Sequence, residues 1–205
     1  IRKLLTAAIF TLCGTGAFAQ LFSNGSELSS LSDFKDGKFQ FHSVKSIYWS
    51  QIVNEGRNYV DRSEKVWVPA RLYLPKTTST KVPAMVIMHG IGGLYMRNGQ
   101  KRAYWEYAEM LVENGIASVV VDTQGARGVG VTNQLGSTEV SVYTFAADAF
   151  AAADMLRTHP AIDPDRIGIM GFSKGGMTTL LATDRRFVSS LSRSASMFKL
   201  HVPIY

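Results

Sequence analysis

The chain has 205 residues, of which 46% are hydrophobic and 19% are charged, a composition that excludes disordered and fibrous proteins and is ordinary for a globular one. This length supports one domain with a sizeable core and is short for two. The net charge is +6, but the basic residues are scattered along the chain, which argues against a nucleic-acid-binding protein.

The first nineteen residues have the pattern of a secretory signal peptide. Arg2 and Lys3 precede the apolar run 4–10, and Ala17-Phe18-Ala19 predicts cleavage after Ala19. A membrane anchor is the alternative, but the apolar run is too short and is interrupted by glycines. We therefore predict a secreted or periplasmic protein that keeps no membrane attachment after cleavage.

The segment that follows the predicted leader differs from the rest of the chain. Residues 20–42 are polar and rich in Ser, Asp and Lys, and we expect them to be a loosely ordered lead-in. Residues 43–205 are expected to form the folded domain. The single cysteine, Cys13, lies in the leader, so the mature chain offers neither a disulfide nor a thiolate.

Six segments are predicted to form strands. Residues 66–74 alternate apolar and polar side chains, as a half-buried strand does, and Pro75 ends them. Continuous apolar runs at 84–88 and 117–121 are typical of central strands in a sheet covered on both faces. The predicted strands are 44–53, 66–74, 84–88, 117–121, 166–170 and 197–204.

Three helices are predicted between these strands, at 103–112, 142–156 and 174–183. The clearest is 142–156, whose apolar residues recur at helical spacing on one face, with Thr144, Asp148 and Asp154 off that face. Alternating strands and helices after an initial hairpin predict an α/β fold, with a mainly parallel sheet and helices on both faces.

The segment GIMGFSKGGMTT, residues 168–179, places one serine between glycines directly after a buried strand. A Gly-x-Ser-x-Gly motif occurs by chance in roughly 7% of chains this long, so its surroundings decide its meaning. Strand, sharp turn and helix are the setting of a nucleophile elbow, in which side chains at Gly171 and Gly175 would collide with neighbouring elements. We predict Ser173 to be the catalytic nucleophile and Gly171 and Gly175 to be the elbow glycines.

A glycine-rich loop after the strand 84–88 fits the same chemistry. His89-Gly90-Ile91-Gly92-Gly93 is an HG-type loop, which in acyl-transfer enzymes supplies a backbone N–H to the oxyanion. We predict the backbone N–H groups of Ile91 and Lys174 to be the oxyanion-hole donors. An ordinary glycine turn is the alternative interpretation of the loop.

Three segments together resemble an α/β-hydrolase of the dienelactone hydrolase family. They are VIMHGIGG, VVVDTQGARG and HPAIDPDRIGIMGFSKGG, and the resemblance extends over about residues 84–205. Ser173 sets the chain apart from members with a cysteine nucleophile and matches the serine branch. The resemblance implies hydrolysis of a small-molecule carboxylic ester or lactone through an acyl-enzyme on Ser173, with no metal ion or organic cofactor.

The rest of the catalytic machinery is not evident. A serine nucleophile needs a base, and the base needs an orienting carboxylate; in this fold they follow the serine as acid, then histidine. After Ser173 only Asp184 and His201 are available. We expect Asp184 in or at the end of the elbow helix and His201 packed in the last strand. We therefore expect a C-terminally truncated piece of an enzyme, with the last strands of the sheet missing and little or no activity.

The other histidines have structural interpretations. We expect His89 to brace the oxyanion loop, and His42 and His159 to be surface or capping residues. Asp122 and Arg127 flank a loop at the carboxyl edge of a strand, where they either shape a pocket or close a turn with an ion pair.

Other functions fit parts of the pattern. A peptidase-type α/β-hydrolase would use the same elbow, and a non-catalytic exported binding protein would keep the fold after losing the triad. A dinucleotide-dependent enzyme fails on spacing, because neither 90–95 nor 125–130 fits Gly-x-Gly-x-x-Gly.

Overall fold

The computed structural model describes residues 38–55, 60, 62–76, 80–96, 99–129 and 140–205. The predicted leader, 1–19, and most of the predicted lead-in lie outside the described residues. Within the described part of the chain, no helix is both long enough and apolar enough to span a membrane.

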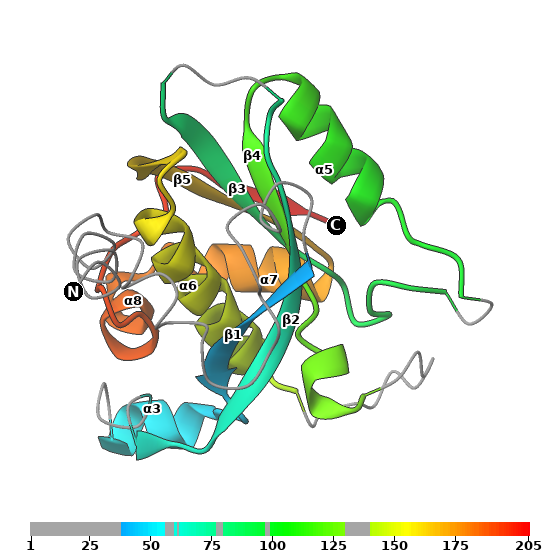
Figure 1. Cartoon of the computed structure of the whole chain (residues 1–205). Coiled ribbons are helices and arrows are strands. Elements are labelled where there is room, and N and C mark those ends of the chain that lie inside the picture. The colour runs from blue at the N-terminus through cyan, green and yellow to red at the C-terminus, as the bar shows by residue number, and fades with distance from the viewer. Residues whose placement is uncertain (1–37, 56–59, 61, 77–79, 97–98, 130–139) are drawn as a thin grey trace, which may run out of the picture.

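One mixed sheet forms the centre of the molecule (Figure 1). Its spatial order is β1-β2-β4-β3-β5-β6, in which β4, β3, β5 and β6 run parallel and β2 is antiparallel to both β1 and β4. The strands are β1 (Lys38–Val44), β2 (Lys65–Tyr73), β3 (Val82–Met88), β4 (Ala117–Val121), β5 (Ile162–Phe172) and β6 (His201–Ile204).

Helices cover both faces of the sheet, and each face has its own apolar core (Figure 1). Trp105 and Leu111 of α5 pack on one face, and Phe145 and Phe150 of α6 pack on the other. The helices are α3 (Trp49–Glu55), α5 (Tyr104–Glu113), α6 (Val142–Thr158), α7 (Lys174–Leu181) and α8 (Arg185–Leu191), with a 3₁₀ turn η2 (Gly125–Arg127). The predicted fold class, a mainly parallel sheet with helices on both faces, is confirmed.

The predicted first strand, 44–53, is wrong. The strand β1 ends at Val44, and the helix α3 occupies most of the predicted range. The Gln51 side chain accepts a hydrogen bond from the Tyr48 N–H at 2.7 Å, a local contact that favours a helical turn there. The true strand begins at Lys38, inside the expected lead-in, and buries Phe39 and Phe41 on one face.

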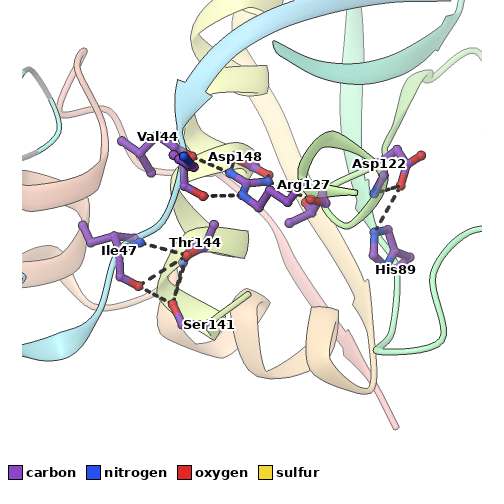
Figure 2. Close-up of polar contacts among 11 residues, drawn as sticks. Val44, Ile47, His89, Asp122, Arg127, Ser141, Thr144 and Asp148 are labelled. Atoms are coloured by element: carbon purple, nitrogen blue, oxygen red, sulfur yellow. Dashed lines mark hydrogen bonds and ion pairs between the residues drawn. The ribbon is translucent and has the colours of Figure 1, made fainter. Parts of the chain in front are cut away.

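The helix α6 is buried more completely than its pattern predicted. Thr144 and Asp148, which fall off the apolar face, are both 0% exposed. Thr144 accepts a hydrogen bond from the Ile47 N–H at 3.0 Å, and Asp148 faces Arg127 at 2.9 Å (Figure 2). Because polar groups of neighbouring segments meet these side chains, burial follows polar pairing at these two positions and not hydropathy.

Three elements near the end of the chain also differ from prediction. The strand β5 begins at Ile162 and ends at Phe172, beyond both ends of the predicted 166–170, and β6 is shorter than the predicted 197–204. The helix α8 was not predicted; Asp184 caps it by accepting a hydrogen bond from the Arg186 N–H at 2.9 Å.

His159 caps the end of α6, as predicted for a capping residue. It is 5% exposed, and its Nδ1 accepts a hydrogen bond from the Ala161 N–H at 3.2 Å, which requires a neutral ring. Burial lowers the pKa of His159 to about 4.

This cap predicts a loss of stability in mild acid. In the unfolded chain His159 takes up a proton near its ordinary pKa of about 6.5, whereas the native state resists protonation down to about 4. Stability is therefore full above pH 6.5 and declines as the pH falls, by on the order of 3 kcal/mol at pH 4. Urea unfolding of His159→Asn across this range should show a shallower decline than the parent, and His42→Asn, at an exposed position, should change the decline less. An unchanged decline in His159→Asn would contradict the assignment.

Candidate active site

Three strand ends meet at one edge of the sheet. Met88, the last residue of β3, lies opposite Val121 of β4 and Gly171 of β5 in parallel register. The segments after these strands therefore leave the sheet side by side. They carry His89, Asp122 and Ser173, and the predicted site residues Ile91, Gly171, Lys174 and Gly175 are near neighbours of His89 or Ser173 in the chain.

Ser173 occupies a strained turn between β5 and α7. Its φ of 51° and ψ of −110° lie in a region that non-glycine residues rarely adopt, and the residue is exposed. A Cβ at Gly171 would lie 2.0 Å from the Gly175 carbonyl oxygen, and one at Gly175 would lie 2.3 Å from the Met88 carbonyl oxygen. The predicted collision at both glycines is confirmed, and the role of Ser173 as the nucleophile stays a prediction.

The HG-type loop lies directly beside this serine. A Cβ at Gly90 would lie 3.3 Å from the Ser173 Cβ. Lys174 is the first residue of α7, where helical N–H groups have no intrahelical acceptor. Neither the Ile91 nor the Lys174 N–H has a hydrogen-bond acceptor among the described residues. The structure thus brings both predicted donor residues to the elbow, and their role as oxyanion donors stays a prediction.

Side chains hold the loop from three directions. His89 Nδ1 donates to the Gly90 carbonyl oxygen at 2.6 Å, and the Gly90 N–H donates to the Tyr104 hydroxyl at 3.1 Å. Gln124, 2% exposed, donates from Nε2 to the Ile91 carbonyl oxygen at 2.8 Å. Sequence reasoning missed Tyr104 and Gln124, because they lie 14 and 33 residues from their partners; the only signal was the place of Gln124 within the segment VVVDTQGARG.

His89 braces the loop from beneath. Its ring is 0% exposed and packs edge-on against Phe145, with centroids 5.1 Å apart. Burial lowers the pKa of His89, which the Gly90 hydrogen bond and the Asp122 charge only partly oppose. Its Nε2 lies 4.0 Å from Asp122 Oδ1, beyond hydrogen-bond distance (Figure 2). A buried, neutral ring already bonded to Gly90 is a support of the loop and not the catalytic base.

Asp122 and Arg127 close a turn but do not pair with each other. Asp122 Oδ1 accepts from the Gly125 N–H at 2.9 Å. The Arg127 guanidinium binds both carboxylate oxygens of Asp148, at 2.9 and 3.0 Å, and donates to the Thr123 carbonyl oxygen at 2.7 Å (Figure 2). Both side chains of this pair are buried, 6% and 0% exposed. The predicted ion pair between Asp122 and Arg127 is therefore wrong, because Arg127 pairs with Asp148 instead.

The remaining candidates for acid and base lie away from the elbow. His201 begins β6 opposite Ile169, four strand residues or about 13 Å before Ser173. Its Nε2 lies 3.3 Å from the Ala182 carbonyl oxygen. Asp184 binds Arg186, and that hydrogen bond lowers its pKa. His42 is exposed against Trp67, with ring centroids 3.6 Å apart. Among the described residues, no three His, Cys, Asp or Glu side chains lie close enough together to hold a metal ion.

The sheet order, the antiparallel β2 and the exposed elbow serine after β5 define an α/β-hydrolase fold. Residues 103–193 match the model of the prolyl oligopeptidase family, Peptidase_S9. Over 111 residues the chain is 32% identical to the protein named "Thiohydrolase aneE" of Aspergillus aculeatus, covering 54% of this chain and 31% of that one. The chain therefore spans about a third of the length of this relative.

The chain is also similar to several solved structures. Est1E from Butyrivibrio proteoclasticus is 22% identical with a TM-score of 0.44, over 60% of this chain and 43% of its own. A glucuronoyl esterase from Solibacter usitatus is 19% identical with a TM-score of 0.41, over 75% of this chain and 46% of its own. The α/β-hydrolase part of the predicted resemblance is confirmed, and the dienelactone hydrolase family stays a prediction.

The buried ion pair predicts a large effect of a small change. In Asp148→Asn the Arg127 charge stays buried without its counter-ion, so the free energy of unfolding should fall by about 3 kcal/mol or more. The exposed pair Lys45–Glu64, at 3.0 Å, offers a control: Glu64→Gln should cost less than about 1 kcal/mol. Denaturant unfolding of both variants measures the difference, and equal losses would show that Asp148 is not an essential partner.

Proposed function

We propose that the protein is a serine hydrolase that cleaves a carboxylic ester or lactone through an acyl-enzyme on Ser173. The observation that carries this proposal is the elbow itself: an exposed serine held at φ 51° between β5 and α7, beside the loop of Gly90. The backbone strain at Ser173 costs folding free energy, and the turn also requires glycine at 171 and 175. Strain of this kind is found mainly at functional sites.

The reaction would proceed in two halves. The Ser173 oxygen attacks the carbonyl carbon while its proton passes to a base, and the C=O electron pair moves to the oxygen, facing the N–H groups of Ile91 and Lys174. The tetrahedral intermediate collapses, the C–O bond to the alcohol breaks, and the alcohol takes the proton from the base. Water then attacks the acyl-enzyme in the same way and releases the acid.

The base for these steps is absent from the described geometry. All four histidines of the chain are described, at 42, 89, 159 and 201, and none hydrogen-bonds to Ser173. We place the base and its acid in parts of the protein outside these 205 residues, which is compatible with the small share of the thiohydrolase relative that the chain covers. The 205-residue chain alone should then be inactive or nearly so.

One alternative to an ester is a peptide bond as the bond that is cleaved. The match of residues 103–193 to the prolyl oligopeptidase family supports a peptidase that would use the same elbow. The names of the other relatives, a thiohydrolase and esterases, favour an ester or thioester of a small molecule. A non-catalytic binding protein would have no use for the strained serine. We further propose that the protein is exported, on the leader pattern of residues 1–19.

The nucleophile is tested by covalent labelling. A fluorophosphonate should label the full-length protein stoichiometrically at Ser173, and Ser173→Ala should abolish labelling without loss of stability. The 205-residue chain should label slowly or not at all, because no base activates the hydroxyl. Rapid labelling of that chain would place the base inside it, and failure of the full-length protein to label would remove the serine-hydrolase proposal.

The substrate class is tested by comparing leaving groups. The full-length protein should hydrolyse 4-nitrophenyl esters of short acids with a far higher kcat/KM than aminoacyl 4-nitroanilides, and Ser173→Ala should lose this activity. Comparable activity on both would favour the peptidase. Hydrolysis of neither, together with absence of labelling, would favour the binding protein.

A further inference from the structure

A guanidinium group lies against the candidate oxyanion loop without a partner of its own. Arg102 is partly buried, and its Nε is buried with no hydrogen-bond partner among the described residues. None of the ion pairs in the described part of the chain includes Arg102. Its terminal nitrogens are not among the buried unpartnered atoms, so solvent still reaches them. The open end of the fork is therefore available to a ligand.

The Arg102 guanidinium packs against Gly92, two residues after Gly90 in the candidate oxyanion loop. A Cβ at Gly92 would lie 2.8 Å from Arg102 Nη2 and 3.1 Å from Cζ, so the guanidinium rests where a side chain would otherwise stand. Gly90 in turn approaches the Ser173 Cβ, and two Cα–Cα steps span at most about 8 Å. The Arg102 guanidinium thus lies near the elbow along this loop.

Backbone hydrogen bonds fix the position of this arginine. Tyr95 and Lys101 form an antiparallel bridge, and the Met96 N–H donates to the Gln100 carbonyl oxygen at 2.7 Å. The Arg102 N–H donates to the Leu94 carbonyl oxygen at 3.0 Å. A short hairpin therefore returns the chain to the loop and presents the guanidinium there.

A partly desolvated cation without a counter-ion is unfavourable, because burial removes water that nothing in the protein replaces. The other buried guanidinium at this edge, Arg127, has its carboxylate in Asp148. The planar fork of arginine matches the two oxygens of a carboxylate, and such pairs are among the stronger hydrogen bonds in proteins. A ligand carboxylate would supply Arg102 with a counter-ion and hydrogen-bond acceptors, as Asp148 does for Arg127.

We propose that Arg102 is a carboxylate-binding subsite of the candidate active site, and that the substrate is an ester bearing a free carboxylate some distance from the scissile bond. This inference rests on the proposed function, because it places the reacting ester at Ser173. The open end of the guanidinium donates to the carboxylate oxygens and orients the ester; the arginine itself takes no part in bond cleavage.

The test compares charged and neutral substrates in the full-length protein. Mono-4-nitrophenyl esters of succinic, adipic and suberic acids vary the distance to the carboxylate, and 4-nitrophenyl esters of monocarboxylic acids of equal length are the neutral set. We expect one charged ester to be preferred, and Arg102→Met to lower its kcat/KM at least tenfold while neutral esters change less than twofold. Lys101→Met, which removes a neighbouring exposed cation, should keep the preference.

Two results would overturn the subsite. Arg102→Met either leaves the preference intact or lowers both sets equally, the latter showing a purely structural role. A failure of the proposed function is seen separately, as absence of Ser173 labelling and of all ester hydrolysis. In that case calorimetric binding of adipate decides: binding that Arg102→Met abolishes and Lys101→Met retains supports the subsite, and binding that is absent or unchanged in Arg102→Met refutes it.

Discussion

The sheet edge that carries Ser173 depends on one steric constraint. The helix α7 packs against the ends of β3 and β5 with no side chain between the backbones. Gly175 lies so close to the Met88 carbonyl oxygen, and Gly171 so close to Gly175, that even one methyl group would collide at either position. Because the helix comes this near, the turn that starts it is forced into the strained conformation of Ser173. The same approach brings the start of α7 beside the strand end that carries the loop of Gly90. One close backbone contact therefore positions Ser173 and the first residues of α7 together.

A second set of contacts fixes what the sheet leaves free. Buried polar side chains hold the loops after β3 and β4: His89 and Gln124 hold the first loop, and Arg127 holds the second through Asp148. In a buried setting these bonds are directional and expensive to break, so the loops keep one arrangement. Such preorganisation is what an oxyanion hole needs, because donors that must reorient during a reaction stabilise its transition state less.

The sequence predicted the features that are local and missed those that are not. The two apolar strands β3 and β4, the helix α5 and the elbow at Ser173 each follow from a pattern within about a dozen residues. Gln124 and Asp148 act through partners far along the chain, and no periodicity marks them. The assignment of 44–53 as a strand failed because a short apolar stretch is compatible with strand and helix alike, and the contact between Tyr48 and Gln51 decided the matter. In α6 the hydropathy pattern predicted Asp148 to lie off the packed face, because hydropathy does not report that the Arg127 guanidinium pairs with it.

The hydrogen bonds of Arg127 to distant parts of the chain affect how the sheet edge beside Ser173 folds. Besides Asp148, its guanidinium donates to the carbonyl oxygens of Val44 and, at 2.7 Å, Lys45, residues that precede it by 83 and 82 positions. The loop after β4 is therefore complete only when the end of β1 has docked, although β1 lies on the far edge of the sheet from β5 and β6. We therefore expect assembly of this edge to wait for contacts of high sequence separation. Partial opening that releases β1 should loosen the loop beside Ser173 as well, which makes the two ends of the sheet one unit in local unfolding.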